Sequence, residues 1–218
     1  DEHFTQVLNL YGGEIAISAG SKGNNTQVKL WVDANQSAIR IETQSDEEVT
    51  ITCTTELMRP VPYTLPSSND RLASSFRGLI DSPVKPSESA DVLVRKSDRI
   101  QWYHRNENSF YETILTKQNV PELIGKYTDP YMNRTFGAAI VGNKMKPQND
   151  STLVSAQRGK KFSLSIYPYT AQTESVNEWD YELNNLIEQS KQIKETVAYQ
   201  KHLEWWDRFW NRSWVFLS

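Results

Sequence analysis

The stretch Lys161-Phe162-Ser163-Leu164-Ser165-Ile166-Tyr167 alternates polar and apolar side chains. Phe162, Leu164 and Ile166 share one side of an extended chain, because successive side chains of a strand point in opposite directions. A period of two with one apolar side is typical of an antiparallel strand that packs on a core. This stretch therefore predicts a strand of a layered β-domain.

The same period recurs along most of the chain before it. Val28, Leu30 and Val32 alternate with polar or aromatic neighbours, and the helical period is absent from this half. Gly12-Gly13 and Asp33 to Gln36 are suited to hairpin turns. The predicted strands cover residues 28–33, 37–42, 49–53, 100–104, 110–116, 135–141, 152–156 and 161–167.

Residues 59–91 interrupt this pattern. Prolines stand at positions 60, 62, 66, 83 and 86, with many serines between them. Proline lacks the N–H that a central strand needs, so the region predicts a long excursion or a sheet edge.

The spacing of apolar residues changes from a strand period to a helical period at about residue 174. Ser175 and Glu178 form a capping box, in which the serine accepts a first-turn N–H and the glutamate reaches back. Apolar residues then follow at helical spacing, and neither glycine nor proline occurs from Ala171 to Ser218. We expect a β-sandwich over residues 1–173 and a helical segment over residues 174–218.

Composition excludes several classes of protein. The chain has 218 residues, a net charge of −3 and a single cysteine, Cys53, which we interpret as a small packing residue. An intrachain disulfide is excluded and a structural zinc site is disfavoured. Acids and bases are interspersed and no long apolar run occurs, so we expect neither a nucleic-acid nor a membrane partner.

The densest group of functional side chains lies in residues 101–109. Trp102, Tyr103, His104, Arg105, Asn106 and Glu107 combine aromatic rings with amide and charged groups. Sugar sites use this mixture, because apolar ring faces stack on aromatics and hydroxyls pair with planar polar groups. The alternative is an ordinary strand end whose arginine and glutamate pair locally and whose rings fill the core.

Catalytic signals are weak. His104 and Glu107 suggest an acid and a base, but a lone pair at this spacing is poor evidence. The other histidines, His3 and His202, lie in dissimilar contexts, so no metal site is expected. No nucleotide or nucleophile fingerprint is present, and we assign no catalytic residue and no cofactor.

The end of the chain is rich in aromatic residues. A single helix cannot hide so many rings from water, because neighbouring positions face different sides. The rings are therefore covered by the sandwich, by another domain, or by a sugar that stacks on them. The rings belong to Trp205, Trp206, Phe209, Trp210 and Trp214.

Four segments together resemble a known family: residues 100–107, 134–137, 167–173 and 202–215. The Trp-Tyr-His-Arg-Asn run and the Trp-Trp-x-x-Phe-Trp-x-Arg-Ser-Trp run are the most specific of these. They resemble the N-terminal β-sandwich domain of unknown function (DUF5703 type) of large bacterial glycan-degrading proteins. Those proteins look like the inverting α-L-fucosidase group.

The resemblance implies an antiparallel β-supersandwich of the galactose-mutarotase-like kind, followed by linker helices toward an (α/α)6 barrel. The barrel would carry the catalytic carboxylates and lies outside this chain, as would the first strands of the sandwich. The domain would be non-catalytic, packed on the barrel of a periplasmic or secreted bacterial protein that acts on carbohydrate. Residues 102–107, Arg134 and Phe136 would lie near the substrate rim or the domain interface, and the C-terminal aromatic residues at that interface.

Two other functions remain open. A free-standing carbohydrate-binding module predicts glycan affinity for the chain alone. A mutarotase-like epimerase would use His104 as acid or base, with a facing carboxylate inside a concave sheet.

Overall fold

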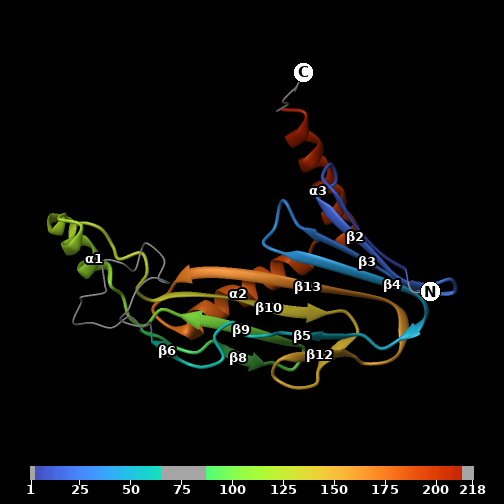
Figure 1. Cartoon of the computed structure of the whole chain (residues 1–218), viewed down its shortest axis with the longest axis horizontal. Coiled ribbons are helices and arrows are strands. Elements are labelled where there is room, and N and C mark those ends of the chain that lie inside the picture. Colours follow the sequence, from blue (N-terminus) through green and yellow to red (C-terminus); the bar gives the residue numbers. More distant parts are fainter. Residues whose placement is uncertain (1–2, 65–86, 213–218) are drawn as a thin grey trace.

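The computed structural model describes residues 3–64 and 87–212. Its largest element is an eight-stranded antiparallel sheet with the order β1-β2-β3-β4-β13-β10-β9-β8 (Figure 1). The strands are β1 (His3–Asn9), β2 (Glu14–Ser21), β3 (Asn24–Val32), β4 (Ile39–Val49), β13 (Gly159–Gln172), β10 (Arg134–Gly142), β9 (Arg99–Arg105) and β8 (Val92–Arg95).

A three-stranded sheet, a two-stranded sheet and four helical segments complete the described part. The second sheet has the order β11-β12-β5, and β6 pairs with β7. The remaining bounds are β11 (Met145–Pro147), β12 (Thr152–Ser155), β5 (Thr52–Thr54), β6 (Tyr63–Thr64), β7 (Ser87–Glu88), α1 (Tyr111–Lys117), a 3-10 turn (Pro121–Leu123), α2 (Val176–Lys191) and α3 (Glu195–Trp210). The predicted fold class, mainly β with C-terminal helices, is confirmed.

One predicted strand is wrong. Residues 110–116 lie largely in α1, which projects beyond the end of the sheet (Figure 1). Among the strands of the described part, none pairs with these residues, so the backbone satisfies its own N–H and C=O groups by helical hydrogen bonds. Aromatic and β-branched composition suggested a strand, but only Leu115 of this helix is buried. Of the predicted excursion at 59–91, residues 65–86 lie outside the described part.

The two sides of the large sheet have different cover. The helix side, which carries Tyr167 of β13 and Ala139 of β10, packs against α2. Trp179, Leu183 and Ile187 of that helix are fully buried there. The serine half of the capping box is confirmed, since the Ser175 hydroxyl accepts from the Glu178 N–H at 3.2 Å. The Glu178 carboxylate also reaches back, but it accepts from the Glu174 N–H at 2.9 Å, one residue before the cap.

The sandwich side faces the small sheet. Ile100, Ile140 and Leu164 of the large sheet pack with Met145 and Leu153 of the small one. Burial raises the pKa of the Cys53 thiol, which lies partly buried against this core. Two sheets that share one apolar layer make the sandwich.

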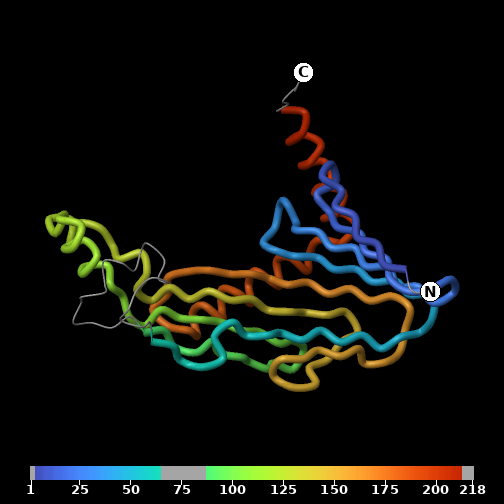
Figure 2. Tube along the Cα trace, viewed as in Figure 1, coloured from blue at the N-terminus to red at the C-terminus, as the bar shows by residue number. Residues whose placement is uncertain are grey.

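Helix α3 covers the helix side of the first strands. It runs beside the β1–β2 hairpin, away from the rest of the sheet (Figure 2). The fully buried indole of Trp31 lies 5.2 Å from the Tyr199 ring and 4.9 Å from the imidazole of His202. The N–H of Ala34 donates to His202 Nδ1, so the neutral ring donates from Nε2 to the Gly12 carbonyl at 2.9 Å.

Candidate functional site

The aromatic and polar run after residue 101 is divided between the two sides of β9. Trp102 and His104 lie on the sandwich side, since Trp102 pairs with Ala138 of β10 and His104 with Phe136. Tyr103 lies on the helix side, with its ring 5.6 Å from the Trp179 indole. Strand alternation therefore prevents the whole run from meeting one ligand.

His104 belongs to a buried polar cluster. Its Nδ1 lies 3.1 Å from Oδ1 of Asp91, and both side chains are nearly inaccessible. Nε of Arg59 donates to the same carboxylate oxygen at 2.8 Å. The Arg59 guanidinium also lies 5.3 Å from the Phe136 ring, which in turn is 5.3 Å from the imidazole. The cluster ties the chain before β6 to β8 and β9.

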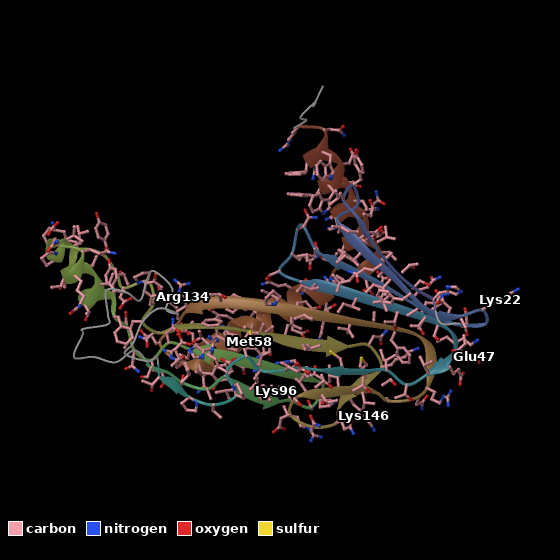
Figure 3. All side chains as sticks on the ribbon, in the orientation of Figure 1. Lys22, Glu47, Met58, Lys96, Arg134 and Lys146 are labelled. Atoms are coloured by element: carbon pink, nitrogen blue, oxygen red, sulfur yellow. The ribbon has the colours of Figure 1, made fainter. Side chains whose placement is uncertain are left out.

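Arg105 is held by acceptors on two segments, the start of β10 and the chain just after β13. It donates to the Thr135 hydroxyl at 2.8 Å, to the Asn133 carbonyl at 3.0 Å and to the Thr173 carbonyl at 2.9 Å. A guanidinium with this many backbone acceptors has a fixed orientation. Arg134 is also bound locally, through the Pro130 carbonyl at 2.8 Å, and lies at the end of the sheet far from Lys22 and Glu47 (Figure 3).

A pocket of about 550 Å³ lies at the end of β9. His104, Arg105, Asn106 and Glu107 contribute to its wall, whereas Trp102, Tyr103, Arg134 and Phe136 do not line it. Three tyrosines from three different segments also line it: Tyr63 of β6, Tyr111 of α1 and Tyr131 before β10. Phenol rings combined with amide, guanidinium and carboxylate groups are suited to binding sugar rings and their hydroxyls.

The aromatic residues of α3 point in two directions. Trp206 packs at Gly13, which has a positive φ of 60° and leaves room for the indole. Trp210 donates from Nε1 to the Leu10 carbonyl at 2.7 Å. Trp205 and Phe209 stack on each other with centroids 5.4 Å apart and planes 8° apart. Phe209 is 43% exposed, and Trp214 lies outside the described residues.

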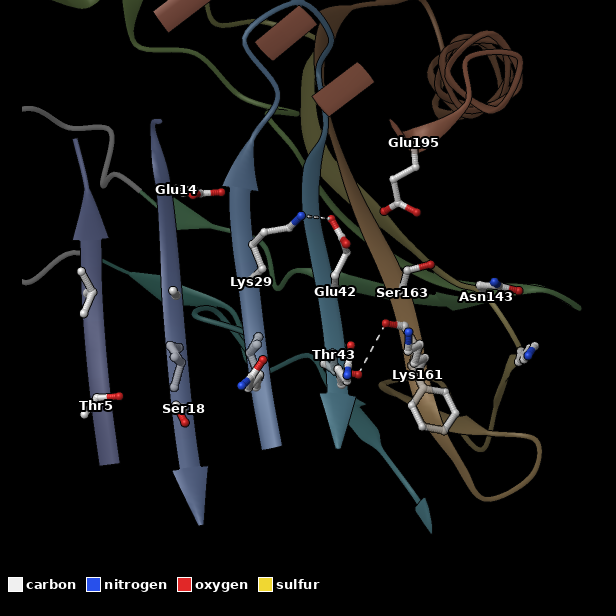
Figure 4. Close-up of a pocket in the computed structure, with 18 residues that line it drawn as sticks. Thr5, Glu14, Ser18, Lys29, Glu42, Thr43, Asn143, Lys161, Ser163 and Glu195 are labelled. Atoms are coloured by element: carbon white, nitrogen blue, oxygen red, sulfur yellow. Dashed lines mark hydrogen bonds and ion pairs between the residues drawn. The ribbon is translucent and has the colours of Figure 1, made fainter. Parts of the chain in front are cut away.

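A second pocket, of about 770 Å³, was not expected from the sequence. It lies on the helix side of β1 to β4 and below the start of α3 (Figure 4). Lys29 forms an ion pair with Glu42 at 2.8 Å, and its Nζ lies 4.0 Å from the centre of the Tyr199 ring. The Tyr199 hydroxyl donates to Glu14 at 2.6 Å.

A third carboxyl enters this second pocket from α3. Glu195 projects from the first turn toward Glu42 and Ser163 (Figure 4). Burial raises the pKa of Glu195, and the negative charge of Glu42 raises it further, against the opposing charge of Arg40. The pocket thus holds one carboxyl with increased proton affinity and one carboxylate in an ion pair. Such a pair can donate and accept protons or hydrogen bonds.

The sequence contained only part of the signal for this second pocket. Lys29 and Glu42 alternate with apolar residues, which predicts a shared polar side for their strands. Their pairing depends on the register, which places Lys29 opposite Glu42. The position of Glu195 depends on how α3 packs, which no local pattern encodes.

Two searches of the described residues were negative. In the described part, no group of three or more histidine, cysteine, aspartate or glutamate side chains could hold a metal ion. None of the helices in residues 3–64 and 87–212 is long and apolar enough to cross a membrane.

The fold and these pockets define a β-sandwich domain with C-terminal helices that carries polar pockets at its sheet ends and sides. A family model, domain of unknown function (DUF5703), matches residues 1–215. The chain therefore belongs to the DUF5703 family, as the sequence resemblance indicated.

Comparisons with curated proteins and with solved structures do not identify a function for the chain. No curated protein matches the chain. Among solved structures, a putative kojibiose phosphorylase from human microbiome is similar over 95% of this chain, with a TM-score of 0.47 and 10% identity. This chain covers 23% of that one.

Proposed function

We propose that this chain is an accessory N-terminal sandwich domain of a larger, glycoside hydrolase-like protein, and that its pocket at the end of β9 contributes to carbohydrate binding. One observation carries the proposal: three tyrosines and four consecutive polar residues, His104 to Glu107, line a single pocket. Tyr63 and Tyr131 are each about half exposed, so their rings are free to stack on a sugar.

The rest of the proposal follows from the resemblance. A catalytic (α/α)6 barrel of the same polypeptide would supply the reactive carboxylates, and the protein would act in the periplasm or outside the cell. Kinship with the inverting α-L-fucosidase group is part of the proposal. The stack of the half-buried Trp205 on the exposed Phe209 supports an interface with the barrel, because apolar rings in water are costly to leave uncovered.

The test uses the full-length protein. Tyr131→Ala removes an exposed ring from the pocket, and Tyr127→Ala removes one from the same connection that does not line it. We expect Tyr131→Ala to weaken affinity for the best ligand of an oligosaccharide array about tenfold or more, and Tyr127→Ala to leave it unchanged. Equal affinities for both variants and the unmodified protein would contradict the proposal.

The same array, applied to residues 1–218 alone and to the full-length protein, separates an accessory domain from a free-standing carbohydrate-binding module. A module would bind the array ligand as residues 1–218 alone, with the affinity of the full-length protein. An accessory domain that completes the rim of a barrel pocket would lose most of that affinity when isolated.

The second pocket favours one other candidate, a mutarotase-like sugar epimerase. Glu195 would protonate the ring oxygen while Glu42 accepts the proton of the anomeric hydroxyl, and reclosure of the ring would return both protons. The sequence predicts His104 for this role, but the structure places its Nδ1 against the Asp91 carboxylate, outside the second pocket. Exchange between α and β anomers of aldoses, followed by NMR, would be accelerated by the chain and abolished by Glu195→Gln.

A further inference from the structure

We propose that the sandwich side of β1, β2 and β3 is a docking surface for further β-strands of the same longer polypeptide. These strands would extend the layer formed by β11, β12 and β5. The inference rests on the proposed function in one respect, that the domain is part of a larger protein.

A row of aliphatic side chains crosses the large sheet and becomes exposed at one end. The strand registers place Ile100, Ile140, Ile166, Ile39 and Val32 side by side on the sandwich side. Ile100 is fully buried and Ile140 is 6% exposed, whereas Val32 is 59% exposed. The row is aliphatic along its whole length, but the layer that buries it does not extend as far as Val32.

A second row repeats this gradient. Leu164, Ile41, Leu30, Ile15 and Leu8 are neighbours across five strands. Leu164 is 7% exposed and Leu8 is 60% exposed. The first row ends at Val32 of β3 and the second continues across β2 to Leu8 of β1, so apolar side chains reach each of the first three strands, and such a surface marks an interaction site.

The opposite side of the same strands has the reverse character. Ser163, Glu42, Lys29 and Ala16 are cross-strand neighbours there and line the second pocket. A strand with a polar side toward solvent and an apolar side toward a core is built for cover on one side. The helix side meets α3 and water, so within residues 3–64 and 87–212 the apolar sandwich side is the one without a covering layer.

The occupant is extended polypeptide because, among the strands that the structure describes, both sheets end in an edge strand with one unpaired side. β5 is an edge strand of the small sheet and β1 an edge strand of the large one. β1 reads His3-Phe4-Thr5-Gln6-Val7-Leu8-Asn9, with no proline, lysine or bulge to prevent pairing. A strand with alternating apolar residues would pair with such an edge and fill the layer beside it.

The source is the same polypeptide because the exposed surface continues an internal interface. The apolar layer between the two sheets passes without a break from Leu164 and Ile41 to Leu30. A tethered strand avoids the free-energy cost of association that a separate chain must overcome. A second copy of the domain is the competing occupant.

Thiol labelling of the full-length polypeptide tests the inference. Val32→Cys places a thiol on the docking surface, and Lys22→Cys places one at the turn between β2 and β3 (Figure 3). Both positions are exposed in the fold described here. We expect maleimide to modify the thiol at position 32 at least tenfold more slowly than the thiol at position 22, as followed by peptide mass spectrometry.

Two results would overturn the inference. Equal labelling rates at the two positions would show that the surface is open in the full-length protein. Protection at position 32 that disappears on dilution into the monomeric range would show that a second copy covers it. Hydrogen exchange of β1 amides in the unmodified protein gives the same comparison if the variants fail to fold. Neither readout involves sugar, so loss of the proposed carbohydrate binding would leave this test unaffected.

Discussion

The central strands β9, β10 and β13 and the first strands β1, β2 and β3 belong to one sheet but have different surroundings. The central strands are covered by α2 on one side and by the small sheet on the other. The first strands have α3 on the helix side, while Val32 and Leu8 are exposed on the sandwich side. At Gly137 of β10 a Cβ would meet the Trp102 backbone of β9, so these two central strands approach too closely there for a side chain.

This difference teaches that period-two alternation reports the geometry of a strand and not the number of layers upon it. Ile140 and Leu30 occupy equivalent places in the alternation, yet one is buried and the other is only half-buried. The contribution of a side chain to the free energy of unfolding should therefore depend on whether a second layer covers it, and not on its place in the alternation. Four predictions examine this difference.

The largest effect is expected at the centre of the helix side. Trp179→Ala should lower the free energy of unfolding by about 3–5 kcal/mol, because a fully buried indole leaves a large cavity. Tyr181→Ala on the exposed face of the same helix is the control and should change it by less than about 0.5 kcal/mol. Urea denaturation measures both, and similar losses would contradict the assignment of the core.

A comparable loss is expected at β4, the strand between the two regions. Arg40 lies buried 3.6 Å from Asp33 and donates to the Ser190 hydroxyl at 2.8 Å. Arg40→Met should cost about 3–5 kcal/mol, because it leaves a buried carboxylate without its cation. Addition of Asp33→Asn should restore part of the loss. A double variant less stable than the single one would show that the ion pair is not the cause.

The two ends of the aliphatic rows give the most direct comparison. Ile140→Ala should cost about 2–5 kcal/mol in the purified domain, whereas Leu8→Ala should cost less than about 0.5 kcal/mol. In the full-length protein the cost of Leu8→Ala should rise toward that of a buried leucine if strands cover the surface. An unchanged low cost there would count against the docking surface.

The smallest effect concerns the polar side of the first strands. The pKa of Glu195 is higher in the folded state than in the unfolded state, so folding strengthens the binding of a proton to this carboxyl. This contribution to stability is fully present below the unfolded pKa of 4.5 and is lost as pH rises through the folded pKa. Glu195→Gln should therefore become more stable relative to the unmodified domain from pH 4.5 to 7, as thermal melts across that range would show. No change with pH would mean that the carboxyl is fully hydrated.

The candidate sites were only partly predictable. Residues 104–107 line the pocket at the end of β9, and the sequence singled them out by the density of polar groups. Trp102 and Tyr103 diverge because strand alternation sends them to opposite sides. The tyrosines at positions 63, 111 and 131 come from separate segments, and no pattern within the sequence joins them.

The sequence by itself determined much of the local structure: where the central strands run, where a serine caps α2, and which side of those strands is apolar. These features depend on neighbouring residues along the chain, through side-chain alternation and first-turn hydrogen bonds. Only the tertiary structure decided which apolar sides are covered and which charges meet, as Glu195 of α3 meets Glu42 of β4. Contacts between residues distant in the chain depend on register and packing, and short-range periodicity contains no information about either.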